Sequence, residues 1–322
     1  MRTGGRRIRL GLALLAVLGL LAAAAPGNAA FASGRAPHRP KVRSRTVTSA
    51  RGRSGSVTSG GYVALGDSYA AGPLIPYQVN VTCLRSEANY PSLVAAALHP
   101  SSFTDASCSG ATTADMAKSQ PVVFGTPPPP QLDALSATTT LVTLTIGGND
   151  IDFATIADTC SLLSLLDPLG APCEAHFTSG GSDQLRAQIA ATAPSVGSVL
   201  AAIHRRSPKA TVLLVGYPDL LPATGPGCWP LVPIADGDVA YLNGVEQALN
   251  AMLASQAAAH GATYVNTYTT SLGHDMCQLL GPKWIEGFIP TLPAAPLHPN
   301  EFGEHAMADQ VLAALHTPLI AG

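Results

Sequence analysis

The sequence predicts an α/β domain in which a parallel β-sheet carries helices on both of its faces. Short apolar runs bounded by Gly, Pro, Asp or Asn alternate with alanine-rich, helix-prone stretches, and such runs are typical of buried strands. Repeated alternation of strand and helix favours a parallel sheet covered on both faces. No internal repeat is visible, and the roughly 260 residues from Gly61 to Gly322 suit one α/β domain.

Five apolar runs predict the strands of this sheet, the second of them weakly. In chain order they are Tyr62–Leu65, Ser102–Ala106, Leu141–Ile146, Thr211–Val215 and Thr263–Val265. The helix-prone stretches are Tyr90–Leu98, Gln184–His204 and Asp238–His260. A last helix is expected over Glu301–Leu315, because Asn300 is a helix-start residue and apolar side chains follow it through the stretch.

The first 32 residues have the pattern of an export signal. Arginines precede an apolar run from Leu10 to Ala25, and small residues follow around Ala30. The run is about 16 residues long, shorter than the ~20 that a membrane-spanning helix needs, so a cleaved signal peptide over residues 1–32 is favoured over an anchor. The pair Arg6-Arg7 leaves the twin-arginine export route open. Either route predicts a secreted protein.

Charge is unevenly distributed along the chain. Of the 18 Lys and Arg residues, 11 lie before residue 55, whereas all 20 Asp and Glu lie from Asp67 onward, so residues 55–322 carry a net charge of −13. Residues 33–60 are rich in Arg, Ser and Gly, which predicts a disordered basic linker or leader, or else a tether to an anionic envelope polymer or lipid. The folded domain is expected over residues 61–322, and its acidity argues against nucleic-acid binding.

The folded part contains six cysteines, which are Cys83, Cys108, Cys160, Cys173, Cys228 and Cys277. An even number in an exported chain predicts disulfides, and none of these cysteines has the Cys-x-x-Cys spacing of a zinc site. Six cysteines allow 15 pairings, among which the sequence does not choose. Sequential pairing is our expectation, since each bridge would then close one local loop.

Glycines and polar residues follow the first three predicted strands. These segments are Gly66-Asp67-Ser68, Cys108-Ser109-Gly110 and Gly147-Gly148-Asn149. In open parallel sheets, ligands bind beyond the carboxyl ends of the strands. We therefore expect the three segments to converge on one edge of the sheet and to form a site there.

The converging segments contain the parts of a site with a serine nucleophile. A serine hydroxyl needs a base to take its proton, and the tetrahedral intermediate needs hydrogen bonds to its oxyanion. Ser68, at a strand-to-helix turn, is the candidate nucleophile, and His298, in the loop before the last helix, is the candidate base. The candidate oxyanion donors are the N–H groups of Ser68 and Gly110 and the amide of Asn149. Each motif alone is also ordinary turn or cap chemistry, but their common edge favours a shared site.

Together the segments resemble the motif blocks of the SGNH, or GDSL, hydrolases over nearly the whole mature domain. The matching residues are Gly66-Asp67-Ser68, Cys108-Ser109-Gly110-Ala111-Thr112-Thr113, Gly147-Gly148-Asn149-Asp150 and His298-Pro299-Asn300. The resemblance implies a three-layer α/β/α, flavodoxin-like fold with a five-stranded parallel sheet in the order 2-1-3-4-5. It also implies the nucleophile, base and oxyanion roles given above, without a metal or other cofactor. The chain is further similar to the secreted actinobacterial branch, which shares three disulfides and a segment like Gly273-His274-Asp275.

The chain departs from the family pattern at one position. The family usually has an aspartate three residues before the histidine, where this chain has Ala295. In a triad the acid holds the imidazole in its useful tautomer, and a backbone carbonyl can do the orienting part of this work. We therefore expect a Ser68–His298 dyad in which the carbonyl of Ala295 orients the histidine. Asp275, from another loop, is the alternative.

These features predict a secreted serine carboxylic-ester hydrolase, an esterase or lipase that acts through an acyl-serine intermediate. Fatty-acyl esters of lipids are the expected substrates, because the loops are apolar and the protein is exported. We expect a monomer that contacts lipid surfaces transiently. One alternative is a polysaccharide acetyl-esterase on the same fold. Another is a non-catalytic cell-envelope binding protein, which the missing acid leaves open.

Two further sets of residues have weaker interpretations. His298, Glu301 and His305 resemble a metal cluster superficially, but ligands on one helix face need separations of three or four residues, and Pro299 intervenes. His305 is therefore expected to be a residue of the helix surface or core. Trp229 and Trp284 can either line an acyl pocket or pack loops together.

Overall fold

The computed structural model describes residues 60–279 and 281–316. The predicted signal peptide, residues 1–32, lies outside the described residues, and so does the predicted basic segment 33–60 except for its last residue. Among the described residues, no helix has the length and apolar character needed to cross a membrane.

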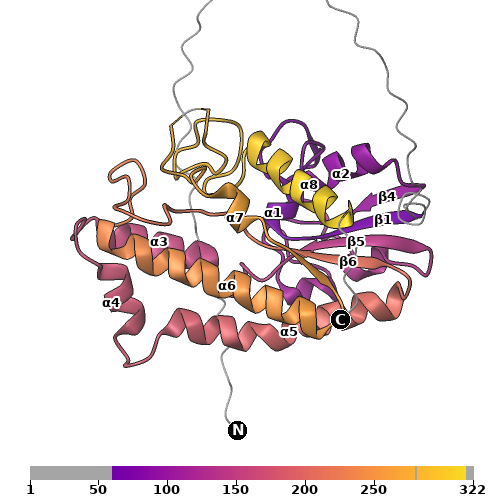
Figure 1. Ribbon diagram of the computed structural model, residues 1–322, viewed down its shortest axis with the longest axis horizontal. Helices are drawn as coiled ribbons and strands as arrows, with labels where there is room; N and C mark the ends of the chain where they lie inside the picture. Colours follow the sequence, from indigo (N-terminus) through magenta and orange to yellow (C-terminus); the bar gives the residue numbers. More distant parts are fainter. Residues whose placement is uncertain (1–59, 280, 317–322) are drawn as a thin grey trace, which may run out of the picture. The chain divides into compact units, whose positions relative to one another are not determined.

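Five parallel strands form the sheet at the centre of the domain (Figure 1). They are β1 (Gly61–Gly66), β4 (Ser102–Asp105), β5 (Thr139–Thr145), β6 (Thr211–Val215) and β7 (Thr263–Val265). Their order across the sheet is β4-β1-β5-β6-β7, which is 2-1-3-4-5 when these five strands alone are counted. This order confirms the predicted fold class. β4 is an edge strand with mostly exposed residues, which explains why its apolar pattern is weak.

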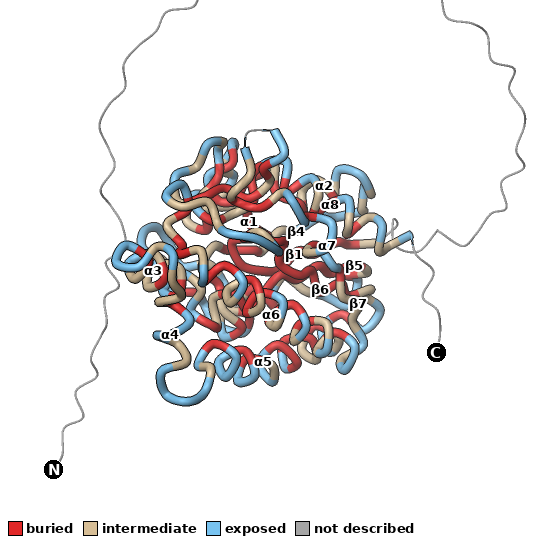
Figure 2. Tube along the Cα trace, turned by 60° about the vertical axis from the view of Figure 1, so that its left-hand side comes forward, coloured by how far each residue is buried: buried red, intermediate tan, exposed pale blue. Residues whose placement is uncertain are grey.

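Side chains alternate between the two faces of the strands and build a hydrophobic cluster on each face. Val63 and Leu65 of β1 belong to the cluster that contains residues of α5 (Gln184–Arg206) and α6 (Val239–Ala259). Tyr62 and Ala64 belong to the cluster with residues of α2 (Tyr90–Leu98) and α8 (Glu301–His316). Figure 1 shows α2 and α8 above the sheet and α5 and α6 below it, and Figure 2 shows the buried strands between them.

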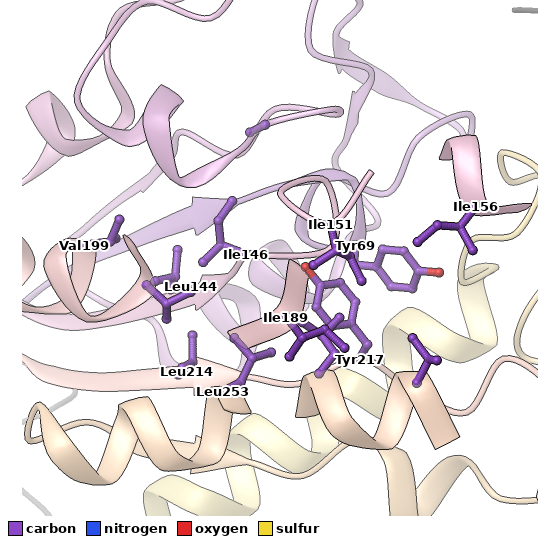
Figure 3. Close-up of a cluster of buried hydrophobic side chains, with 14 of the residues drawn as sticks. Tyr69, Leu144, Ile146, Ile151, Ile156, Ile189, Val199, Leu214, Tyr217 and Leu253 are labelled. Carbon is purple, nitrogen blue, oxygen red and sulfur yellow. The ribbon is translucent and has the colours of Figure 1, made fainter. Parts of the chain in front are cut away.

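The cluster on the α5 and α6 side anchors the strands whose ends carry the site. Leu144 of β5 and Leu214 of β6 lie near Leu253 of α6 and Val199 of α5 (Figure 3), and each of these side chains is at most 5% exposed. Burying an aliphatic side chain of this size stabilises a fold by about 1.5–3 kcal/mol. The strand ends are therefore rigid supports for the loops that follow them.

Shorter elements fill the connections and were not individually predicted. They are α1 (Ser68–Ala71), α3 (Phe153–Ser164), α4 (Pro172–Thr178), α7 (Tyr268–Ser271), the hairpin strands β2 (Gln78–Asn80) and β3 (Arg85–Ser86), and the 3-10 helices η1 (Thr113–Met116), η2 (Gln131–Ala134) and η3 (Asp236–Asp238). The helices α1, α3 and α7 follow β1, β5 and β7 along the chain. They therefore lie beyond the carboxyl ends of these strands, where a site is expected.

Three disulfides staple the loops of the domain. They join Cys83 to Cys108, Cys160 to Cys173 and Cys228 to Cys277, which is the sequential pairing that we expected. The first connects the hairpin loop to the loop after β4, the second connects α3 to α4, and the third connects the loop after β6 to the loop after α7. No cysteine of the described residues is free.

Candidate active site

Ser68 stands at a tight turn between β1 and α1. Gly66 has φ +150°, and a Cβ at this position would lie 2.6 Å from the carbonyl oxygen of Thr145, so the turn requires glycine. Asp67 caps α1 by accepting the N–H of Tyr69 at 3.0 Å, and its own N–H donates to the carbonyl of Thr145 at 2.9 Å. These contacts fix Ser68 as the first residue of the helix, at the carboxyl end of β1.

The structure brings His298 to Ser68. The Nε2 atom of His298 lies 2.7 Å from the Oγ of Ser68, and its Nδ1 atom lies 2.7 Å from the carbonyl oxygen of Pro296. A carbonyl oxygen accepts but does not donate, so Nδ1 carries the ring hydrogen and Nε2 is free to accept the serine O–H. Burial lowers the pKa of His298, and the Pro296 carbonyl opposes this shift. The net lowering of the pKa favours the neutral imidazole, which is the form that can accept the proton of Ser68.

The prediction that the Ala295 carbonyl orients His298 is wrong by one residue. The carbonyl of Ala295 accepts the backbone N–H of His298 at 3.2 Å, and the carbonyl that meets Nδ1 is that of Pro296. Residues 295–298 form a turn that this hydrogen bond closes. Pro296 is its second residue and Leu297, with φ +65°, is its third, as in a type II turn. In a type II turn the peptide between the second and third residues is rotated by about 180° relative to a type I turn. This orientation of the peptide directs the Pro296 carbonyl toward the imidazole of His298.

Asp275, the alternative orienting group, is occupied elsewhere. Its Oδ1 accepts the N–H of Cys277 at 2.8 Å, and its Oδ2 accepts the side-chain amide of Gln278 at 3.1 Å. Asp275 is 1% exposed and stabilises its own turn. Among the described residues, the partners of the His298 ring nitrogens are therefore Ser68 and the Pro296 carbonyl.

The loop that carries His298 is held from two sides. The hydroxyl of Tyr69 donates to the carbonyl of Leu297 at 2.6 Å, and the Tyr69 ring lies against the imidazole with 5.0 Å between ring centres. On the other side, the N–H of Glu286 donates to the carbonyl of His298 at 2.9 Å, and the side-chain amide of Asn300 donates to the Glu286 carboxylate at 2.8 Å. The residue after the nucleophile thus also supports the base.

Three candidate N–H donors follow the strands β1, β4 and β5 along the chain. The backbone N–H groups of Ser68 and Gly110 have no hydrogen-bond acceptor among the described residues. Gly110 has φ +81°, a conformation that glycine adopts without strain. The amide of Asn149 donates one hydrogen to the carbonyl of Ala111 at 2.9 Å, which fixes its plane and leaves its second hydrogen available.

Tyr217 connects the nucleophile turn to the loop that carries Asn149. Its hydroxyl donates to Oδ2 of Asp67 at 2.5 Å and accepts the N–H of Gly148 at 2.8 Å, and its ring meets that of Tyr69 edge-on (Figure 3). Burial raises the pKa of Asp67 to about 7, although the hydrogen bond from Tyr217 opposes the shift. The sequence analysis did not single out Tyr217. Its position two residues after the end of β6 was an available signal, because sites in parallel sheets lie just beyond the carboxyl ends of the strands.

An apolar pocket opens beside Ser68 and Asn149. It encloses about 880 Å³ of space between atoms, part of it continuous with solvent, and its walls come from α3, α6 and the loops before α6 and after α7. Representative wall residues are Ile156, Ala157, Leu242, Val245, Met276 and Phe288. Such a wall matches an alkyl chain, since contact with it removes apolar surface from water without burying polar groups.

The remaining candidates of the sequence take other places. Trp284 stacks on His274 with 3.6 Å between ring centres, and neither Trp284 nor Trp229 lines the apolar pocket. Trp284 therefore packs loops together. His305 is exposed on α8, and no group of three or more potential metal ligands occurs in residues 60–279 and 281–316.

The fold and the arrangement around Ser68 define an ester hydrolase with a serine at the carboxyl end of the first strand of a parallel sheet. The chain belongs to the GDSL-like lipase/acylhydrolase family, whose model matches residues 64–306. This range contains Ser68, Gly110, Asn149 and His298, so the whole candidate site lies within the match.

Named relatives come from Streptomyces. Lipase 2 of Streptomyces coelicolor is 40% identical over 264 residues, which are 79% of this chain and 85% of that protein. The crystal structure of phospholipase A1 from Streptomyces albidoflavus NA297 matches with a TM-score of 0.66 and 31% identity, over 80% of this chain and 99% of that one. The extracellular lipase from Streptomyces rimosus matches with a TM-score of 0.65 and 31% identity, over 80% and 100%.

Proposed function

We propose that this protein is a secreted esterase or lipase that hydrolyses fatty-acyl esters of lipids through an acyl-enzyme on Ser68. The observation that carries the proposal is the Nε2 to Oγ distance of 2.7 Å between His298 and Ser68, which also lines an apolar pocket. The hydrogen bond supplies the nucleophile and its base, and the pocket supplies a place for the acyl chain.

In the first half of the reaction, Ser68 Oγ attacks the carbonyl carbon of the ester while its proton moves to Nε2 of His298. The carbonyl of Pro296 keeps its hydrogen bond to Nδ1–H, which holds the imidazolium in place. The tetrahedral intermediate then collapses, Nε2–H protonates the leaving alcohol oxygen, and the acyl group stays on Ser68. Water attacks this ester with His298 again as base, which releases the fatty acid and restores the serine.

The negative oxygen of each tetrahedral intermediate needs donors that are already in place. The N–H groups of Ser68 and Gly110 and the free amide hydrogen of Asn149 are the donors that we assign to it. Fixed donors of this kind contribute about 10²–10³-fold each to turnover in serine hydrolases. Asn149 is fixed by the Ala111 carbonyl, and Gly148 before it is fixed by Tyr217.

The pocket favours fatty-acyl chains over acetyl groups. An acetyl-esterase acting on polysaccharide needs a shallow polar site, whereas the cavity beside Ser68 has predominantly apolar walls. Relatives described as lipases and a structural match described as a phospholipase A1 agree with lipid esters as the substrate class. A non-catalytic binding protein would have no need for a protonated Nδ1, an accepting Nε2 and vacant N–H donors at one point.

Export is part of this proposal. Three disulfides fit an oxidising compartment outside the cytoplasm, and a structural match is described as an extracellular lipase. We assign residues 1–32 as a signal peptide, residues 33–60 as a basic leader and residues 61–322 as the catalytic domain of a monomer.

Hydrolysis of p-nitrophenyl esters from acetyl to palmitoyl tests the proposal. We expect turnover by the purified protein with intact disulfides, and a fall of about 10³-fold or more with Ser68→Ala or His298→Ala, since the two side chains act as one unit. Circular dichroism of the variants serves as the folding control. Equal turnover of wild type and Ser68→Ala would refute the assignment of the nucleophile.

A further inference from the structure

Two buried carboxyl side chains, Asp67 and Glu246, line the largely apolar pocket. Asp67 has both oxygens hydrogen-bonded, one to the N–H of Tyr69 and one to the O–H of Tyr217. Glu246 of α6 differs, because its Oε2 accepts the N–H of Leu220 at 3.2 Å while its Oε1 has no hydrogen-bond partner among the described residues. Its side chain is only 8% exposed. Glu246 is thus a buried carboxyl that the fold leaves half satisfied, at the wall of the acyl pocket.

The surroundings of Glu246 favour its uncharged form. Burial raises its pKa well above the ordinary value, the nearby Asp219 raises it further, and the N–H of Leu220 opposes both. Asp219, in the loop after β6, is itself fully buried and has an unpartnered Oδ2 within the described part of the chain. Neither of the two ion pairs in this part of the chain includes Glu246.

The other titratable groups that interact with Glu246 or Asp219 bring no positive charge. Tyr69 of α1, Tyr264 of β7 and Tyr268 of α7 are phenols whose pKa values are raised, by burial first and by negative charge at Glu246 in addition. Burial first, and then the charge of Asp275 in the loop after α7, raise the pKa of Asp219 to about 7. Ionised Glu246 would therefore face only phenols and carboxyls from these elements.

We propose that Glu246 determines the acyl-chain selectivity of the pocket, because a long acyl chain binds beside its carboxyl more tightly while that carboxyl carries its proton. The inference rests on the proposed ester-hydrolase function of the same site. Leu242, Val245 and Leu249, which flank Glu246 on α6, line the pocket with it. A chain that fills the pocket therefore lies against this helix, whereas a short acyl group covers less of the wall.

The cost of binding differs between the two charge states of Glu246. An ionised carboxylate without a counter-ion needs water, and a long alkyl chain would displace that water from the pocket. An uncharged carboxyl is much less costly to cover. Long-chain esters consequently lose affinity when the pH rises through the raised pKa of Glu246, and short-chain esters lose less.

The ratio of kcat/KM for p-nitrophenyl decanoate over p-nitrophenyl butyrate isolates this effect, because titration of His298 acts on both esters alike. In the wild type we expect the ratio to fall about tenfold between about pH 6 and pH 9, the scale of one poorly compensated buried charge. In Glu246→Gln, which has the same shape and no charge, the ratio is expected to be independent of pH. A flat ratio in the wild type, or an unchanged fall in Glu246→Gln, would overturn the inference.

Glu304→Gln is the matched control. Glu304 of α8 is also buried, also has an unpartnered Oε1 among the described residues, and also has a strongly raised pKa, but it accepts the N–H of Tyr90 and does not line the pocket. Its variant should show the wild-type fall. Asp219→Asn should move the fall to lower pH, because it removes the neighbouring charge that raises the pKa of Glu246. A fall that persists in Glu246→Gln would assign the effect to Asp67, the other carboxyl of the pocket.

A binding measurement separates failure of this inference from failure of the proposed function. Titration calorimetry of 1-decanol into the Ser68→Ala protein reports on the pocket without turnover. In this protein we expect the dissociation constant of 1-decanol to rise about tenfold as the pH rises over the same range. In the double variant Ser68→Ala, Glu246→Gln the dissociation constant should not change with pH. Absence of ester hydrolysis together with this pH dependence would reject the proposed function and keep the role of Glu246. Binding that is independent of pH would reject the role of Glu246 even in an active enzyme.

Discussion

At the scale of single residues, His298 is oriented by backbone groups in place of a carboxylate. The Pro296 carbonyl accepts Nδ1–H at 2.7 Å, which selects the tautomer but offers a dipole instead of a negative charge to the imidazolium. The position of the ring then depends on the loop that carries it. Tyr69 supports this loop through the hydrogen bond from its hydroxyl to the Leu297 carbonyl at 2.6 Å.

Tyr69→Phe should therefore lower turnover while leaving substrate binding nearly intact. The variant keeps the ring against the imidazole but loses one buried hydrogen bond, and the cost of such a bond corresponds to a fall of about 3- to 10-fold in kcat. Steady-state kinetics on p-nitrophenyl butyrate would show a change in kcat with little change in KM. An unaltered kcat would mean that the loop keeps its position without this bond.

Asp275→Asn is the matched comparison for Tyr69→Phe. Asp275 is buried and hydrogen-bonded to its own turn, so its loss should change kcat by no more than about twofold, provided the protein folds. A fall of ~10³-fold in this variant would instead give Asp275 the role of the triad acid.

The positions of Ser68, Gly110, Asn149 and His298 could be predicted because each belongs to a short motif at a strand end or before a helix. The choice between the carbonyls of Ala295 and Pro296 could not, since it depends on the direction of one peptide plane. That plane is set by the positive φ of Leu297, which is not an expected property of leucine. Tyr217 was overlooked because it belongs to no motif, although it lies two residues after the end of β6.

At the scale of elements, α3 and the loop that follows it present leucines to solvent. Leu162 near the end of α3, Leu165 at its C-cap, and Leu166 and Leu169 in the loop that follows are between 61% and 87% exposed, so apolar side chains gather on this short segment. Leu231, in the loop before η3, is also 72% exposed. This loop is linked to the end of α3 by the hydrogen bond that the Ala235 N–H donates to Ser164 Oγ. Since α3 also lines the acyl pocket, these leucines are suited to the expected transient contact with a lipid surface.

Replacement of Leu165 and Leu166 by serine tests this contact. We expect unchanged kcat/KM on soluble p-nitrophenyl butyrate and a loss of about tenfold or more in activity on phosphatidylcholine vesicles, because two exposed leucines contribute several kcal/mol when they enter an apolar phase. Val123→Ser, at a position that is 99% exposed in the loop after η1, is the control and should retain the wild-type activity on vesicles. Equal activity of the double variant and the wild type on vesicles would exclude a role for these leucines.

The elements that sequence could predict are those with a strong period or a buried apolar run. The strands β1, β5 and β6 are short runs of mostly buried residues, and α5 and α6 are long alanine-rich helices, so their positions follow from pattern alone. By contrast, α4 has only seven residues. It is held by the disulfide of Cys173 and by the backbone N–H groups of Cys173 and Glu174, which donate to the Asp238 carboxylate at 3.0 and 2.8 Å. Tertiary contacts of this kind override weak local propensity and leave no periodic signal.

At the scale of the whole molecule, the fold raises the pKa values of several buried carboxyls. Burial raises the pKa of Asp67 and of Asp219 to about 7, and it raises those of Glu246 and Glu304 well above the ordinary value. In the unfolded chain the same groups lose their protons near pH 4. Between about pH 4 and pH 7 the folded state thus binds more protons than the unfolded state, and the free energy of unfolding falls as the pH rises.

The domain should therefore be more stable in mild acid than in mild base. We expect the melting temperature to fall by about 5 °C or more from pH 5 to pH 8, although His298, whose pKa is lowered, contributes in the opposite direction. Scanning calorimetry of the disulfide-intact protein measures this slope. Asp219→Asn should flatten it, because an amide cannot ionise, whereas Asp309→Asn at an exposed position of α8 should leave it unchanged. A melting temperature that rises over this range would show that the buried carboxyls ionise in the folded state at ordinary pH, which would also remove the basis for an uncharged Glu246 in the acyl pocket.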